Sequence, residues 1–326
     1  MKKLYPLKFN SLYNEKIWGG QKLKQVLGID FGDMPNCGEA WALSGVKDNE
    51  TNVANGFLAG NKLNELVEVY MDDLVGGKVY EKYKNEFPIL VKFIDATNYL
   101  SIQVHPDDVL AQKRGLGNGK TEMWYIIDAD KGSELISGFS KKVTQKTYLD
   151  HLKNEKLLEI LNVEKVNTGD VFFIPAGRVH ALGPGILLAE IQQTSDTTYR
   201  IYDWGRVDAQ GNPRELHTEE ALEALDFNVY ETYRSEYGRV KNQSIEVVAQ
   251  PCFTTNVLHF DKALAKDYNE LDSFVIYTCL QGSMRVKYPD GEENLKMGEC
   301  LLIPNEISDL KLFPSTESKL LETYII

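Results

Sequence analysis

A seven-residue pattern occurs twice in this chain, and the repetition limits its possible folds more than any other feature. Gly169–Pro175 aligns without gaps with Gly298–Pro304, and each copy has a turn glycine, an acidic residue, an apolar run and a terminal proline. Upstream, Lys131–Ser133 similarly matches Gln281–Ser283 ahead of another apolar run. A repeat of this kind predicts two related β-domains that meet near residues 235–250. The alternative is a coincidence between two common strand–turn patterns.

Short apolar runs of strand type dominate the chain, and they indicate a sandwich or a barrel. We therefore expect a fold dominated by β-strands and decorated by inserted helices. The expected strands are Pro88–Phe93, Ser101–Val104, Met123–Ile127, Val171–Ile174, Ile186–Ile191, Phe253–Leu258, Phe274–Cys279, Leu301–Ile303 and Lys319–Ile325. Helices are expected over Leu63–Leu74, in a short segment capped by Asp107, and over Thr144–Leu161.

The bulk composition is that of an ordinary globular enzyme and excludes several partners. The 326 residues are 43% hydrophobic and 26% charged, and they fit one large domain or, better, two. A formal charge of −12 repels nucleic acids and anionic membranes, so neither is an expected partner. The sequence has no signal-type start and no apolar run of membrane-spanning length, which predicts a cytoplasmic protein.

The four cysteines are scattered and form no C-x-x-C pair. We interpret Cys37, Cys252, Cys279 and Cys300 as reduced, mostly buried thiols. A catalytic cysteine is the less favoured alternative, because Cys279 and Cys300 both lie in apolar strand patterns.

Three polar side chains share one face of an expected strand. Ser101–His105 alternates polar and apolar residues, so Ser101, Gln103 and His105 point the same way. The apolar run just upstream favours burial of this region. Because buried polar groups need partners, and a cation satisfies several at once, the pattern indicates a metal site.

Two further residues are possible metal ligands. Glu122 opens a strand after a glycine-rich loop, although, taken alone, a solvated edge charge is the favoured interpretation of a carboxylate in that position. His180 follows two turn glycines and Pro175, which stops its strand, so that the histidine reaches the next inward-facing position.

The segment that contains His180 carries a family resemblance. Residues 169–180 follow the pattern Gly-x5-Pro-x-Gly-x2-His, which resembles the second signature motif of the cupin superfamily, a group of small metal-binding β-barrels. The first cupin motif usually has His-x-His followed closely by Glu, whereas here Gln103 replaces the first histidine and Glu122 lies further on. This departure resembles one branch, the type I mannose-6-phosphate isomerases (phosphomannose isomerases), whose Ser-Ile-Gln-x-His-Pro-Asp motif is Ser101–Asp107 here.

The resemblance covers most of the chain. Its other segments are Ile17–Gly20, Gly38–Trp41, Lys120–Met123, Ile174–His180, Glu190–Gln193 and Thr198–Trp204. It implies one Zn²⁺ per chain, an isomerase that interconverts mannose 6-phosphate and fructose 6-phosphate through a cis-enediol, and a sugar phosphate as the small-molecule partner. The zinc ligands implied by it are Gln103, His105, Glu122 and His180, and Gln103 is not counted as a ligand in every family member.

The resemblance also implies a division into two cupin (β-barrel or jelly-roll) domains. We expect a catalytic metal-binding domain over 1–240, with a helical insertion at about 141–162, and a C-terminal domain over 241–326. The C-terminal domain should be degenerate, because Asp309 aligns with His180 and no Gln-x-His pattern precedes it. The sequence does not determine the oligomeric state.

Two charged residues are expected to take part in catalysis. The resemblance implies that Arg200 is the catalytic arginine, and an inward-facing Arg200 could stabilise an enediolate or hold the sugar. Taken alone, it could equally be a surface ion-pair residue. Glu190 in an apolar strand is a candidate base, since burial would raise its pKa, or else a residue that orients a ligand.

Phosphate recognition requires a cation and a hydroxyl group. Lys120 and Ser101 are near metal ligands in the sequence, and the family resemblance implies that they face the substrate. Lys120 on its glycine-rich loop could otherwise be a mobile surface lysine. The remaining histidines, His151, His217 and His259, are expected to be surface, capping or structural residues.

Two rival functions remain compatible with these residues. A cupin dioxygenase would use redox-active iron and open coordination positions for oxygen. A non-catalytic sugar-binding cupin would keep the fold and the metal without turnover.

Overall fold

The computed structural model describes residues 3–207 and 210–326, which form two compact units. The central unit contains residues 16–20 and 94–235, and the terminal unit contains residues up to 15, 21–93 and 236–326. The last segment begins close to the expected boundary at 240, but residues 21–93 cluster with the C-terminal segment instead of the expected metal-binding domain. Within the terminal unit, Leu7 and Leu302 exchange backbone hydrogen bonds of 2.8 and 2.9 Å, which tie the N-terminus to the second repeat.

One sheet of the central unit carries the first repeat. Its antiparallel strands lie in the order β14 (Arg234–Ser235), β10 (Val171–Ile174), β7 (Glu122–Ala129) and β12 (Ile186–Gln193). Glu122 is aligned with Ile174 on one side and with Gln192 on the other. The expected strands around Met123, Val171 and Ile186 are thus confirmed, and their pairing places Glu122 in the middle of the sheet.

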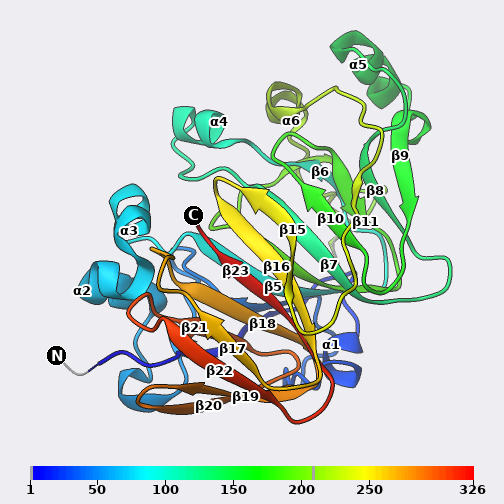
Figure 1. Ribbon diagram of the computed structural model, residues 1–326. Coiled ribbons are helices and arrows are strands. Elements are labelled where there is room, and N and C mark those ends of the chain that lie inside the picture. Colours follow the sequence, from blue (N-terminus) through cyan, green and yellow to red (C-terminus); the bar gives the residue numbers. More distant parts are fainter. Residues whose placement is uncertain (1–2, 208–209) are drawn as a thin grey trace. The chain divides into compact units, whose positions relative to one another are not determined.

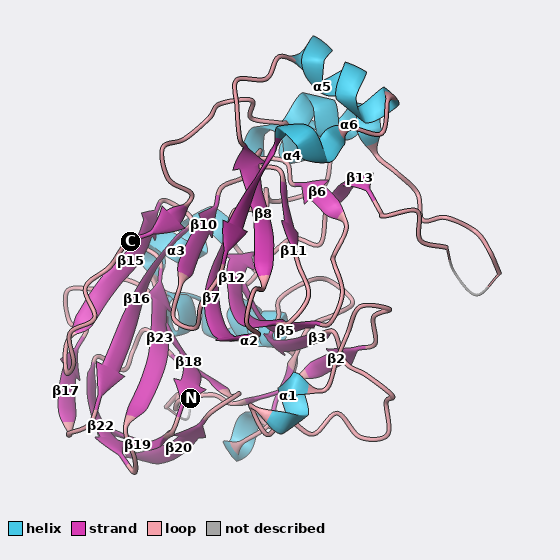
Figure 2. Cartoon of the chain, turned by 90° about the vertical axis from the view of Figure 1, so that its right-hand side faces the viewer, coloured by secondary structure: helices cyan, strands magenta, loops and turns pink. Residues whose placement is uncertain are grey.

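The second sheet of the central unit has the order β13 (Tyr199–Tyr202), β6 (Ile102–Val104), β11 (His180–Leu182), β8 (Glu134–Phe139) and β9 (Leu161–Lys165). One face is apolar because alternate residues such as Ile102, Ala181 and Ile136 belong to a buried cluster with residues of the helices. These helices are α4 (Asp108–Lys113), α5 (Gln145–Lys153), the 3-10 helix η2 (Leu157–Ile160) and α6 (Thr218–Ala224). Figure 2 shows α4, α5 and α6 grouped near β6 and β13.

The helical segments agree with the expectation at α4 and differ at α5. Asp107 caps α4 by accepting a hydrogen bond from Leu110 N at 2.8 Å, as expected. The helix expected over Thr144–Leu161 instead ends at Lys153, and Leu161 opens strand β9. Glu155 has φ 58°, a left-handed conformation that a right-handed helix does not accommodate, so the leucine periodicity continues past the end of the helix.

The interior of the central unit is filled by a second apolar cluster that includes Trp18 and Trp124. Trp18 O accepts hydrogen bonds from Thr97 N at 2.8 Å and Thr97 Oγ1 at 3.0 Å. A Cβ atom on Gly20 would lie 2.5 Å from Asp95 Oδ2, so any larger residue would require the buried Asp95 side chain to shift. The Ile17–Gly20 segment therefore has a packing role in this unit.

The terminal unit repeats the strand pattern without the ligands. One of its sheets has the strand order β15 (Ser244–Gln250), β16 (Phe253–Phe260), β23 (Ser318–Tyr324), β18 (Val275–Gln281) and β21 (Cys300–Ile303). Another has the order β17 (Leu264–Asp267), β22 (Asp309–Pro314), β19 (Ser283–Tyr288) and β20 (Gly291–Lys296). The strand β21 pairs with β18 as β10 pairs with β7, which puts Val275 at the position of Glu122. Asp309, at the position of His180, is exposed. The second cupin domain is thus degenerate, and an apolar cluster fills it.

The other elements of the chain lie within its first 96 residues. They are β1 (Phe9–Asn10), β2 (Leu12–Asn14), α1 (Lys22–Gln25), β3 (Glu39–Leu43), β4 (Asn52–Val53), η1 (Gly56–Leu58), α2 (Leu63–Val75), α3 (Gly77–Tyr83) and β5 (Ile89–Ala96). Figure 1 labels α1, α2, α3 and β5 among them. The helix expected over Leu63–Leu74 corresponds to α2, which has a break at Met71, where φ is 45°. No helix in the described part of the chain is long and apolar enough to span a bilayer. Burial raises the pKa of both Cys279 and Cys300 to about 12, which fits the expected structural thiols.

Candidate metal centre

Two buried histidines in the central unit present the same ring nitrogen to a shared point. His105 Nδ1 is 3.0 Å from Thr197 O, and His180 Nδ1 is 2.9 Å from Arg178 O. A carbonyl oxygen can only accept, so each Nδ1 carries the proton and each Nε2 keeps a lone pair. Burial lowers the pKa of His180 to about 3, so that its ring is neutral at physiological pH.

Glu122 lies between the two Nε2 atoms. Its Oε1 is 3.3 Å from His180 Nε2, and its Oε2 is 3.6 Å from His105 Nε2. Tetrahedral Zn²⁺ with bonds of about 2.0–2.1 Å requires neighbouring ligand atoms to be about 3.3–3.4 Å apart. Two imidazole lone pairs and a carboxylate that converge at these distances fit a divalent cation. Glu122 is only 1% exposed, so its interpretation as a solvated edge charge was wrong.

Gln103 is the fourth residue at this point. Its Nε2 is 3.2 Å from His180 Nε2, and its Oε1 is 3.4 Å from Ser101 Oγ. Rotation of the amide by half a turn exchanges these two atoms and directs Oε1 to the histidine side, while Nε2 can then donate to the Ser101 hydroxyl. The donor set is therefore compatible with direct ligation by Gln103.

Strand register brings Gln103, His180 and Arg200 together. Gln103 is aligned with His180 on β11 and with Arg200 on β13, so the three side chains point to the same face of the sheet. The Gly–Pro turn before His180 also behaves as expected. Gly177 has φ 88° and donates its backbone N–H to His105 O at 2.9 Å, which joins the segments that carry the two histidines.

Lys120 and Ser101 are both buried beside the ligands, with exposed fractions of 5%. Lys120 Nζ is 3.8 Å from Glu122 Oε2, and Lys120 N donates to Pro106 O at 3.0 Å. The interpretation of Lys120 as a mobile surface lysine was thus wrong. A Cβ atom on the preceding Gly119 would lie 2.6 Å from the Asp107 backbone, so the loop is packed closely against the start of α4.

Arg200, a residue predicted from the sequence, lies with two arginines that were not predicted, Arg206 and Arg214. Its Nη1 donates to Glu215 O at 2.8 Å, while burial, followed by the charges of Arg214 and other neighbours, lowers its pKa. Arg214 Nε donates to Asp203 Oδ2 at 2.7 Å, and Arg206 Nη1 donates to Tyr99 O at 2.6 Å. Arg206 and Arg214 both pair with the same Asp203 carboxylate. The cluster gives an acidic protein a local concentration of positive charge.

Glu190 is buried and is connected to His180 through Trp124. It is 4% exposed, and its Oε2 accepts a hydrogen bond from Trp124 Nε1 at 2.9 Å. The Trp124 ring meets His180 edge-on, with centroids 5.3 Å apart. In the degenerate domain, Glu322 is aligned with Tyr277 just as Glu190 is aligned with Trp124. The interior carboxylate therefore occurs in both repeats, although the histidines and Glu122 do not.

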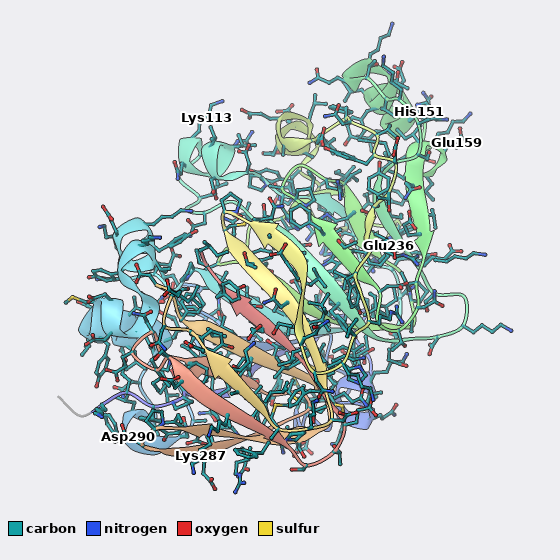
Figure 3. The ribbon with its side chains drawn as sticks, viewed as in Figure 1. Lys113, His151, Glu159, Glu236, Lys287 and Asp290 are labelled. Carbon is teal, nitrogen blue, oxygen red and sulfur yellow. The ribbon has the colours of Figure 1, made fainter. Side chains whose placement is uncertain are left out.

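The other histidines lie outside the donor group. His151 is on α5, away from the strands that carry the ligands, as Figure 3 shows. Its Nδ1 donates to Thr147 O at 2.8 Å. His259 pairs with Glu317 at 2.6 Å in the terminal unit. His217 is the N-cap residue of α6, which agrees with the expected capping position. Its Nδ1 also accepts the backbone N–H of Arg200 at 3.1 Å and so supports the strand that carries that arginine.

Comparison with known proteins identifies the family. The model of the catalytic domain of type I phosphomannose isomerases matches residues 6–137. A mannose-6-phosphate isomerase from Streptococcus mutans is 33% identical over 306 residues, which are 93% of this chain and 93% of that protein. The chain belongs to the type I phosphomannose isomerase family. A second member of that family, ManA from Bacillus subtilis, is 33% identical over 94% of this chain and 95% of its own length.

Solved structures of phosphomannose isomerases agree with this assignment. The crystal structure of the Bacillus subtilis mannose 6-phosphate isomerase matches with a TM-score of 0.88 and 30% identity, over 98% of this chain and 99% of that chain. The predicted fold class and the predicted enzyme class, an aldose–ketose isomerase, are thereby confirmed. The match over nearly the whole chain favours the isomerase over the dioxygenase and the non-catalytic sugar-binding protein.

Proposed function

We propose that this protein interconverts mannose 6-phosphate and fructose 6-phosphate with one Zn²⁺ held by His105, Glu122 and His180. The observation that carries the proposal is the convergence of these three donors, whose ligand atoms all lie within 4.8 Å of one another. Gln103 would be the fourth ligand. With one carboxylate and three neutral donors, the site would keep a formal charge of +1 and remain a good electrophile.

The proposed reaction moves a proton between C2 and C1 of the open-chain sugar through a cis-enediol. Negative charge develops on O1 and O2 during this transfer, and a bound zinc would supply Lewis-acid stabilisation of that charge. Arg200 would add a guanidinium group, because its position opposite Gln103 in the sheet directs it to the same face.

Recognition of the phosphate group is assigned to Lys120 and Ser101, both buried beside the ligands. The positive charge around Arg200, with Arg206 and Arg214 nearby, favours the approach of a dianion to this side of the central unit. Such a local charge is needed because the whole chain carries −12. A location in the cytoplasm stays a prediction.

Glu190 was predicted to act as a base or to orient a ligand. Its hydrogen bond to Trp124, whose ring contacts His180, supports the second role. We expect Glu190→Gln to weaken zinc binding and to keep turnover per bound ion near the wild-type value. Loss of turnover at unchanged zinc affinity would favour the base instead.

The isomerase proposal is tested in deuterated water. Protein stripped with a chelator, with and without added Zn²⁺, is incubated with mannose 6-phosphate, and C1 and C2 are followed by NMR. We expect fructose 6-phosphate and deuterium at the exchanging carbon only in the zinc-loaded sample. A sample that binds stoichiometric zinc but gives neither fructose 6-phosphate nor deuterium uptake would refute the proposal.

A further inference from the structure

Gln192 is a fully buried glutamine whose hydrogen bonds within the described residues go to none of the proposed ligands. It is aligned with Glu122 in the sheet and is 0% exposed. Its Nε2 donates to Gln193 O and to Ser195 O, both at 2.8 Å. Because carbonyl oxygens accept and cannot donate, the two bonds define which way the amide points.

These two bonds hold the turn that follows β12. Within this turn, Thr197 N donates to Ser195 Oγ at 3.4 Å. The carbonyl of the same Thr197 accepts from His105 Nδ1 at 3.0 Å. A continuous series of contacts therefore leads from the Gln192 amide, through residues 193–197, to the ring of His105.

The two histidines differ in how they are oriented. His180 donates to Arg178 O, only two residues away along the chain, so its own turn supplies the acceptor. His105 takes its acceptor from Thr197, which is 92 residues distant in sequence. A remote acceptor keeps its place only if the turn that carries it is held.

We propose that Gln192 is a positioning residue for the metal centre. By holding the turn at residues 193–197, it keeps the Thr197 carbonyl in place, which keeps His105 protonated at Nδ1 and directs Nε2 to Glu122. The inference rests on the proposed metal site. In this role Gln192 orients one ligand, His105, and does not contact the sugar.

A purely space-filling role for Gln192 fits the contacts less well. Its Oε1 is buried and has no hydrogen-bond partner in the described part of the chain. Leucine would fill a similar volume without burying an unpaired acceptor. A glutamine here therefore costs free energy of desolvation, and its two donated hydrogen bonds offset that cost.

The test uses Gln192→Leu in the full-length protein, with Asn64→Leu as the matched control. Asn64 also bridges two backbone groups, Gly45 O at 2.7 Å and Phe87 N at 3.0 Å, but lies in the terminal unit. Zinc affinity is measured by chelator competition, and the tautomers of ¹⁵N-labelled histidines are read by NMR on metal-free protein. We expect Gln192→Leu to bind zinc about 10–100-fold more weakly and to show mixed His105 tautomers with unchanged His180. Asn64→Leu should retain wild-type affinity and tautomers.

Wild-type zinc affinity in folded Gln192→Leu, or an unchanged Nδ1–H tautomer of His105, would overturn the inference. If the leucine variant does not fold, Gln192→Asn, one methylene shorter, takes its place with the same two readouts. Failure of the wild-type chain to bind zinc would refute the proposed metal site, and the tautomer measurement would still decide the role of Gln192.

Discussion

Replacing Lys120 with methionine should strengthen zinc binding while it weakens catalysis. Lys120 Nζ is 3.8 Å from Glu122 Oε2, and both side chains are almost completely buried. In the metal-free protein the ammonium group neutralises the carboxylate, so an arriving cation must compete with it. Methionine keeps the length and volume of the side chain but removes the competing charge.

The distance sets the size of the effect. Unit charges 3.8 Å apart attract each other by about 4 kcal/mol at an effective dielectric constant of about 20, which is a ceiling for this pair. One third of that ceiling, about 1.4 kcal/mol, corresponds to tenfold tighter zinc binding. We therefore expect Lys120→Met to bind zinc about tenfold more tightly. The KM for the sugar phosphate should rise, because the proposed phosphate contact is lost.

Chelator competition measures the zinc affinity, and steady-state kinetics on the zinc-saturated protein measure KM. Lys113→Met is the control, since Lys113 on α4 pairs with Glu223 at 2.7 Å on the protein surface (Figure 3). It should leave zinc affinity and KM unchanged. Equal or weaker zinc binding by folded Lys120→Met would refute the electrostatic reasoning.

Further substitutions and a change of pH probe the same unit. His180→Ala should lose stoichiometric zinc, whereas Arg200→Ala should keep it and lose turnover, as metal analysis and kinetics would show; metal loss in the arginine variant would contradict these roles. Burial lowers the pKa of His180 from 6.5 to about 3. Between these pH values the unfolded chain therefore binds more protons than the folded protein does, so the metal-free protein should lose stability as the pH falls from 6.5 towards 3. Urea unfolding at pH 7 and pH 5 measures this loss, which His180→Gln should reduce. Gly20→Ala should destabilise the fold by roughly 1–3 kcal/mol, because its Cβ would lie 2.5 Å from Asp95 Oδ2. The control is Gly77→Ala, whose Cβ would lie 3.5 Å from Asp272 Oδ2, an ordinary contact distance. Thermal unfolding should show a lower melting temperature for Gly20→Ala and little change for Gly77→Ala.

Local patterns in the sequence account for much of the candidate metal centre. The alternation over Ser101–His105 predicts that Gln103 and His105 share a face, and they do because a strand has a two-residue period. Pro175 and Gly177 predict the turn that delivers His180. These signals involve near neighbours, whose geometry depends on backbone sterics alone.

Some local signals were misleading because the deciding contact was distant. The leucine spacing over Thr144–Leu161 continues after α5 ends, since Leu161 pairs with Phe139 in a strand. Lys120 follows glycines that suggest mobility, yet its loop packs on the start of α4. In both cases tertiary packing overrode a local preference.

The sequence by itself predicted the strand faces, the turn before His180, and His105 and His180 as candidate metal donors, because these depend on residues a few positions apart. Gln103 and Glu122 became expected ligands only through the family resemblance. Only the tertiary structure decided which donors meet. Glu122 opens β7 in one sheet, His180 opens β11 in the other sheet, and His105 directly follows β6, so their distances of 3.3 and 3.6 Å depend on how the two sheets of the central unit face each other. Strand pairing and sheet packing join segments tens of residues apart, and for the same reason no local pattern reveals the support of His105 by Gln192.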